Sequence, residues 1–179
     1  MNEVQLGGGY ASGMFYTAPK GTPLPAYPGA TLSSAWKEVG DIDEDGITFT
    51  PRDSSTLKNW AGKPKRVIPG TDPGTIKGKV MDTTEAVLKT IFGDNNVIVT
   101  PADSTHGKLI KVNMDSKPEP AAFLFIMKNG DVMSYVGTED GLISELGDVA
   151  FKNNEAIEWD ITIQGDWTRV DDDGESESY

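Results

Sequence analysis

The only histidine of the chain, His106, lies in a short polar segment beside Asp103 and Ser104. A serine, a histidine and an aspartate can form a hydrolytic triad, in which the histidine accepts the proton of the serine nucleophile and the carboxylate orients the imidazole ring. Residues this close together in one loop rarely reach the geometry of a triad. We therefore interpret residues 101–107 as a turn between two strands and do not expect catalysis there.

A second segment with possible chemistry is residues 41–46, Asp-Ile-Asp-Glu-Asp-Gly, whose carboxylates are spaced as in the opening of an EF-hand calcium loop. Such a loop needs a bidentate glutamate at its twelfth position, which is Arg52 in this chain. The residues from Ile47 to Thr50 alternate between apolar and polar, as in a strand rather than a flanking helix. We interpret Asp41 to Asp45 as a turn that leads into a strand, with weak divalent-cation binding as the alternative.

Other sequence signatures of enzymes do not occur. The chain has no phosphate-binding P-loop, no dinucleotide-binding glycine motif, no zinc-protease motif and no nucleophile elbow. Cysteine is absent, which excludes disulfides, thiolate zinc sites and a cysteine nucleophile. We therefore expect no enzymatic activity, no cofactor and no metal ion.

The composition is that of one acidic domain. The chain has 179 residues, with 16 basic and 28 acidic side chains and a net charge of −12, which argues against tight binding of nucleic acid through its phosphates. It contains no run of 18 apolar residues and no basic-then-apolar signal pattern at its start, so we expect a soluble protein with no membrane partner.

The clearest helix signal covers residues 82–93. Asp82 can cap its first turn, with Glu85 reaching back, and Gly93 provides the left-handed residue that ends it. A helix this short is marginal alone, so it must pack on a sheet. One apolar stripe is formed by Thr84, Val87, Leu88, Ile91 and Phe92.

The rest of the central region is typical of strands. Residues 155–163 alternate best, with acidic side chains on the outer face, and residues 122–127 are apolar throughout, which predicts burial on both faces. Asn129-Gly130 is the strongest hairpin signal. About eight strands with one helix predict a mainly β fold, a sandwich or small barrel with one flanking α-helix. The strand markers are Ile47, Ile76, Val97, Leu109, Ala122, Val132, Val149 and Ile157.

Proline, glycine and charge divide the chain into three parts. Residues 1–33, rich in proline and glycine, predict an extended arm, and residues 34–170 form the β-domain. Residues 171–179 hold five acids and no base, which predicts a solvated tail. The arm carries more apolar area than a linker needs, notably Tyr16, Leu24 and Tyr27, so we expect it to lie on another surface.

Residues 53–74 contain prolines and glycines with little periodicity, which indicates a long loop or a splayed hairpin. Tryptophan among basic residues is typical of protein interfaces. The segment predicts either a solvated loop or a loop that docks on an acidic copy of the same protein, with nucleic-acid binding as a third alternative and Trp60 packed under its own loop as a fourth. The basic stretch runs from residue 58 to residue 79, where six cations face only Asp72 and give a local charge of +5. These cations are Lys58, Lys63, Lys65, Arg66, Lys77 and Lys79, and Trp60 lies among the first four.

The order of these features resembles the major tail tube proteins of long-tailed, siphovirus-like bacteriophages. An extended arm with Pro23-Leu24-Pro25 precedes the strand entry at residues 36–47, a loop with Trp60 follows, and the helix signature Asp-Thr-Thr-Glu-Ala-Val-Leu occupies residues 82–88. The resemblance covers roughly residues 15–165 and does not include the acidic tail.

The resemblance implies a structural virion protein. Six copies would close into a ring, the rings would stack into a tube, and genomic DNA would pass through the tube without specific binding. Its partners would be further copies of itself and other tail and baseplate proteins, in the phage tail and, during assembly, in the host cytoplasm. Residues 10–33 and 53–74 would bridge subunits. The interface candidates are Tyr16, Leu24, Tyr27, Lys58, Trp60, Lys63, Lys65 and Arg66.

Two interpretations from other classes remain open from sequence. A monomeric β-domain that binds a carbohydrate or calcium would need the turn from Asp41 to Asp45 to bind metal, and a hydrolase would need His106. Bacterial secretion tube proteins share the architecture that the resemblance implies.

Overall fold

The computed structural model describes residues 15–69, 72–129 and 132–172. The fold is mainly β, as predicted, and its described part has one α-helix, α1 (Glu85–Phe92), followed by the short 3-10 helix η1 (Asp94–Asn96). The strands are β1 (Phe15–Pro19), β2 (Lys37–Gly40), β3 (Ile42–Thr50), β4 (Ser54–Lys58), β5 (Pro64–Pro69), β6 (Thr75–Val80), β7 (Val97–Thr100), β8 (Leu109–Val112), β9 (Ala121–Asn129), β10 (Val132–Leu146), β11 (Trp159–Gly165) and β12 (Thr168–Asp172).

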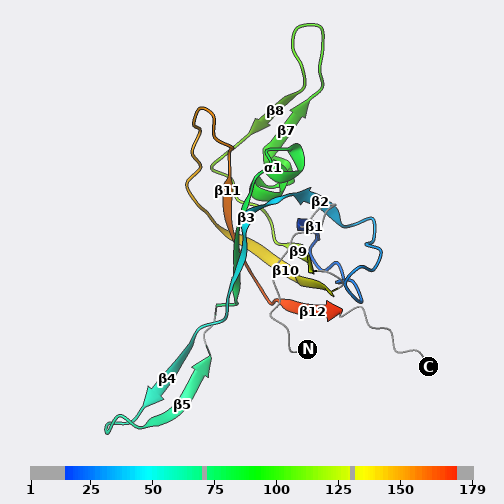
Figure 1. Cartoon of the computed structure of the whole chain (residues 1–179). Coiled ribbons are helices and arrows are strands. Elements are labelled where there is room, and N and C mark those ends of the chain that lie inside the picture. Colours follow the sequence, from blue (N-terminus) through cyan, green and yellow to red (C-terminus); the bar gives the residue numbers. More distant parts are fainter. Residues whose placement is uncertain (1–14, 70–71, 130–131, 173–179) are drawn as a thin grey trace, which may run out of the picture.

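One large antiparallel sheet organises the molecule (Figure 1). Its strands follow the order β2-β1-β9-β10-β11-β6-β3, and β12 pairs with β10. Strand β10 is shared: its first half lies between β9 and β12, and its second half pairs with β11. A register shift between Thr138 and Gly141 separates the two halves. Two hairpins, β4–β5 and β7–β8, stand apart from this sheet.

Apolar clusters cover both faces of the sheet. Successive side chains of a strand point to opposite faces, so β9 directs Phe123 and Phe125 into one cluster and Leu124 and Ile126 into the other. The predicted burial of residues 122–127 on both faces is therefore confirmed for Ala122 to Ile126. The larger cluster also contains the buried faces of α1, β6 and β11, with Trp159, Ile161 and Ile163 buried as their alternation predicts.

Helix α1 packs its apolar stripe on the larger cluster, but its start differs from the prediction. Thr84, not Asp82, is the N-cap, and its hydroxyl accepts a hydrogen bond from the Val87 N–H at 3.3 Å. The Asp82 carboxylate instead accepts from the backbone N–H of Asp41 at 3.0 Å, which ties the helix entry to the start of β3. Gly93 ends the helix with φ 90°, and its N–H donates to the Lys89 carbonyl.

The predicted arm is corrected within its described part, residues 15–33. Strand β1 lies inside the main sheet between β2 and β9, and Phe15 is fully buried. The following segment lies on the second cluster of its own chain, where Leu24 and Leu32 pack. The Tyr135 hydroxyl donates to the Pro25 carbonyl at 2.7 Å and fixes the segment there. Leu24 and Leu32 therefore add to the core of this domain, and residues 1–14 lie outside the described residues.

Two boundaries near the C-terminus also differ from the prediction. Val149 lies in the connection between β10 and β11, and Ile157 precedes β11, although both pack partly on the larger cluster. Asp171 and Asp172, assigned to the acidic tail, belong to β12, because this strand pairs with the first half of β10. The remainder of the tail and the predicted Asn129-Gly130 turn between β9 and β10 lie partly or wholly outside the described residues.

Candidate subunit interface

The segment 53–74 forms a hairpin, one of the two forms its sequence allowed. Strands β3 and β6 pair along the edge of the sheet, and the chain between them continues as β4–β5, which extends away from the body (Figure 1). The base of the hairpin is fixed. The Gly74 carbonyl accepts from the Gly165 N–H and from Trp167 Nε1, both at 3.1 Å, and Arg52 pairs with Asp166 at 3.1 Å.

The tip of the hairpin is a built turn that carries Trp60. The Asn59 N–H donates to the Lys63 carbonyl at 2.9 Å, and the Asn59 side-chain oxygen accepts from the Lys63 N–H at 2.8 Å. Gly62 takes φ 76°, the left-handed conformation that closes a three-residue hairpin loop. The turn holds Trp60 away from its own chain, with a relative exposure of 106%. A tryptophan packed under its own loop is thus excluded.

The hairpin is both apolar and basic on its exposed surface. Leu57 and Val67 are 55% and 62% exposed, beside Trp60. Residues 54–69 contain no acid, and none of the four cations makes an ion pair with a described residue. They are Lys58, Lys63, Lys65 and Arg66, all exposed. A surface of this composition fits a partner that is partly apolar and acidic.

The structure separates the interface candidates into two groups. Tyr16 and Leu24 are partly buried against the second cluster of their own chain. Tyr27 is 56% exposed on the same segment. The five hairpin candidates are brought together, and only they form one continuous projecting element.

The hairpin β7–β8, which sequence reasoning did not select, extends from the opposite end of the molecule (Figure 1). Its apolar side chains Ile110 and Met114 alternate with polar ones but are 38% and 52% exposed, and Ile98 is 57% exposed. The reason is that β8 pairs only with β7 and not with the main sheet.

The loop of β7–β8 is the predicted turn around His106. Asp103 Oδ1 accepts from the Thr105 N–H and hydroxyl, both at 2.7 Å, and from the His106 N–H at 3.0 Å. These bonds hold the pKa of the Asp103 carboxyl below its ordinary value, with the Thr105 hydroxyl as the largest cause. His106 Nδ1 lies 2.8 Å from the Gly107 carbonyl and Nε2 lies 3.1 Å from Asp103 Oδ2. Both ring nitrogens therefore face acceptors in the turn and not Ser104.

The segment from Asp41 to Asp45 was predicted as a turn before a strand, and this is wrong for most of it, because β3 already begins at Ile42. Gly46 takes φ 70° at the irregularity between Ile42 and Ile47, where the pairing with β6 shifts register. In the described ranges, no three acidic or histidine side chains are placed together so that they could hold a metal ion.

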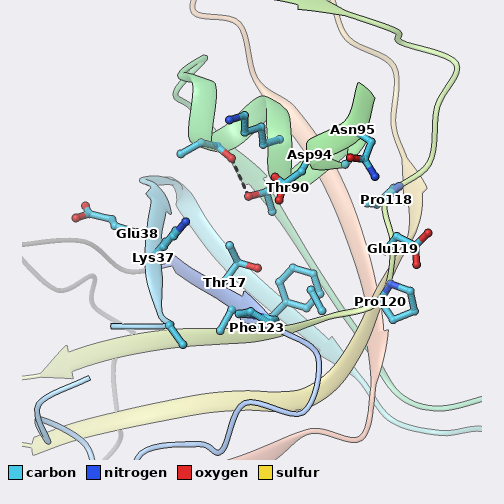
Figure 2. Close-up of a pocket in the computed structure, with 17 residues that line it drawn as sticks. Thr17, Lys37, Glu38, Thr90, Asp94, Asn95, Pro118, Glu119, Pro120 and Phe123 are labelled. Carbon is cyan, nitrogen blue, oxygen red and sulfur yellow. Dashed lines mark hydrogen bonds between the residues drawn. The ribbon is translucent and has the colours of Figure 1, made fainter. Parts of the chain in front are cut away.

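A groove of about 580 Å³ lies between α1, the strands β1 and β2, and the segment from Pro118 to Ala121 (Figure 2). Ala18, Ala35, Ala86 and Phe123 give it an apolar lining. Thr90 of α1 points into it, with its hydroxyl donating to the Ala86 carbonyl at 2.8 Å. Exposed carboxylates are contributed by Glu38, Asp94 and Glu119.

A second groove, of about 420 Å³, lies over the outer face of β6 and β11 and the connection from β10 to β11. Its carboxylates are largely compensated. Glu158 pairs with Lys79 at 3.6 Å, Asp160 with Lys77 at 3.8 Å and Glu155 with Lys152 at 3.4 Å. Its lining has only Ala150 and Ala156 as apolar residues.

Comparison with known proteins decides the family. A family model described as phage tail tube protein matches residues 10–169. The chain belongs to this family. As a tail tube protein it is structural and not an enzyme, it is located in the virion tail, and its partners are copies of itself and other tail components. The family description names phage tails in general, so the restriction to siphovirus-like phages stays a prediction.

Other comparisons are weaker. A search of curated proteins found no match to this tail tube protein. Among solved structures, the anti-feeding prophage cap, a tube-terminating cap, is similar at 12% identity with a TM-score of 0.42, covering 94% of this chain and 95% of that one. The sheath–tube complex of an extracellular contractile injection system, PVC, in its extended state, is similar at 11% identity with a TM-score of 0.37, covering 90% and 89%. At these scores the family assignment rests on the family model alone.

No helix in the described part of this tail tube protein combines the length and apolar character that crossing a membrane requires.

Proposed function

We propose that this chain is the major tail tube subunit, that six copies close into a ring, and that stacked rings enclose a channel through which genomic DNA passes. The subunits assemble in the host cytoplasm before the tail is complete. The observation that carries the proposal is the β4–β5 hairpin, which presents Trp60 and four uncompensated cations to solvent on a chain of net charge −12.

The energetics of the hairpin support a partner in the assembled state. An isolated two-stranded hairpin is marginally stable at best in water, and β4–β5 has no described contact beyond its base that covers Leu57, Trp60 or Val67. Burial of these side chains against another copy would remove apolar surface from water. The four cations would meet an acidic neighbour, because the rest of the chain carries the excess of acids.

The charge of the chain also suits a channel. DNA phosphates are repelled by a surface of the same sign, so an acidic lumen lets DNA slide without being retained. The proposal therefore includes no residue that binds DNA specifically.

The test is electron microscopy of the purified protein over a series of protein and salt concentrations. We expect rings or tubes with a central hole and sixfold symmetry. A ring of another symmetry would overturn the hexamer, and a protein that remains a monomer throughout, also in the presence of the other tail components, would overturn the tube.

A charge-reversal variant tests the role of the hairpin within this assembly. Lys63→Glu, Lys65→Glu and Arg66→Glu together should abolish rings and tubes. The matched control reverses three exposed lysines elsewhere, Lys111→Glu, Lys128→Glu and Lys152→Glu, and should leave assembly intact. Intact tubes from the hairpin variant would show that these cations have no part in assembly.

A further inference from the structure

The hairpin tip carries an exposed tryptophan that no described residue of its own chain covers. Trp60 sits at the apex of a turn that is fixed by the Asn59–Lys63 hydrogen bonds and by the left-handed Gly62. Because the turn is ordered without Trp60 packing on anything, little backbone freedom is lost when this side chain is buried elsewhere. Tryptophan is enriched among the residues that contribute most of the binding energy at interfaces, and such residues lie in well-packed pockets near the interface centre.

The groove beside α1 has the size and lining to receive such a side chain. It measures about 580 Å³ and is lined by small apolar residues, with the ring of Phe123 at its base (Figure 2). Thr90 and Thr17 also line it and leave room beside the helix, because neither has a long side chain. The described part of the chain leaves this groove open.

The groove and the hairpin lie at opposite ends of the β3–β6 pair. The Met81 N–H donates to the Asp41 carbonyl at 3.1 Å, so the chain enters β3 and leaves β6 toward α1 at the same end. The hairpin leaves from the other end, after Thr50 and before Thr75. A hairpin therefore points away from the groove of its own chain. A contact between the hairpin of one copy and the groove of another is head-to-tail, and head-to-tail contacts repeat into rings or stacks.

Charge favours the same pairing. Lys63 and Lys65 flank the tip, and the groove presents the exposed carboxylates of Glu38, Asp94 and Glu119. Of the two lysines in its lining, Lys89 is already paired with Glu85 at 2.8 Å, which leaves Lys37 as an opposing charge. The other groove is a weaker receptor, because lysines of its own chain compensate its carboxylates and only two alanines could contact the indole.

We propose that Trp60 of one copy inserts into the groove between α1, β1 and β2 of a second copy, with Lys63 and Lys65 against its carboxylate rim. The inference rests on the proposed tube assembly and identifies the receptor surface within it.

Cross-linking tests the pairing directly, because the natural chain contains no cysteine. Lys63→Cys keeps Trp60 in place and puts one thiol at the tip, and Thr90→Cys puts one thiol in the groove. The two single variants are mixed, assembled and treated with a short thiol cross-linker. We expect a covalent dimer that forms only in the mixture. Glu119→Cys provides a second groove position in an exposed segment outside the helix. The control partner is Ala150→Cys in the other groove, for which we expect loss of the cross-link.

The outcomes separate the two proposals. Rings or tubes that cross-link through Ala150→Cys, or that give no product with either groove variant, would overturn the inference and leave the tube function standing. Cross-linked dimers without rings or tubes would support the inference and count against the tube. A monomer that neither assembles nor cross-links would overturn both.

Discussion

Two tryptophans mark the contrast between the body of the molecule and the β4–β5 hairpin. Trp159 of β11 is 3% exposed, its Nε1 donates to the Thr83 hydroxyl at 3.1 Å, and its ring meets Phe92 edge-on at 5.7 Å. Trp60 is 106% exposed and held out by its turn. The same residue type thus completes the core in one region and is fully exposed to solvent in the other. Contacts within the chain hold the body together, whereas no described contact covers Trp60 at the hairpin tip.

The first way to sharpen this contrast is to remove Trp159. Trp159→Ala should destabilise the folded chain by about 3–5 kcal/mol, because it leaves a large cavity against α1 and deprives the Thr83 hydroxyl of its donor. Denaturant unfolding of the unassembled protein measures the loss. A change below about 1 kcal/mol would show that the larger cluster does not depend on this side chain.

A second test addresses the bend of β10 inside the body. A Cβ added at Gly141 would lie 2.8 Å from the Phe123 ring and 2.8 Å from Thr138, both buried, so Gly141→Val should cost about 1–3 kcal/mol through overpacking. Gly107 is the matched control, because a Cβ there meets nothing within 4 Å. Gly107→Val should change stability by less than about 0.5 kcal/mol. Equal losses of stability in the Gly141→Val and Gly107→Val variants would show that overpacking is not the cause.

The same contrast explains how far sequence could predict the fold. The helix stripe and the apolar run of β9 were predictable, because burial within one chain leaves a local period. The double pairing of β10 was not, since Thr138 to Gly141 contains the polar and glycine residues of a turn but forms a register shift between two halves of one strand. Leu24 shows another limit, because its proline-rich context predicted an extended arm, whereas the side chain packs on the second cluster of its own chain.

The candidate site was predictable in part for a similar reason. Trp60 and its neighbouring cations are close in sequence, so their composition by itself indicates an interface. The groove gathers residues from Thr17 to Phe123 whose types are ordinary, and no local pattern connects them. Only the pairing of β1 with β2 and β9 brings them together beside α1.

A third test concerns the ion pairs that join the β7–β8 loop to α1. The Lys108 ammonium, 2.6 Å from Glu85, and then Lys89 lower the pKa of the Glu85 carboxyl from 4.5 to about 2. The folded state therefore binds a proton less readily than the unfolded state. The stabilisation is present above pH 4.5 and is lost as the pH falls toward 2.

Glu85→Gln checks this sign, and its effect should be small because the groups are exposed. The variant should be less stable than the natural chain near neutral pH, and the two stabilities should converge as the pH falls through this window. Unfolding midpoints measured across the range, at low and high salt, give the comparison. A difference that persists unchanged at the lowest pH would mean that the glutamate acts through packing.

The smallest effect on folding should come from Trp60. This variant is the most informative one, because the substitution should weaken assembly and leave the stability of the unassembled chain unchanged. Trp60→Ala should change the stability of the unassembled chain by less than about 0.5 kcal/mol, since the side chain contacts no core. Assembly should weaken by about 2 kcal/mol or more per contact, roughly 30-fold in the concentration at which rings or tubes form. Light scattering over a concentration series measures this shift, and Trp60→Phe should retain part of the association. If Trp60→Ala instead lowered the unfolding midpoint as Trp159→Ala does, the hairpin would belong to the core of its own chain, and the division between the two regions would fail.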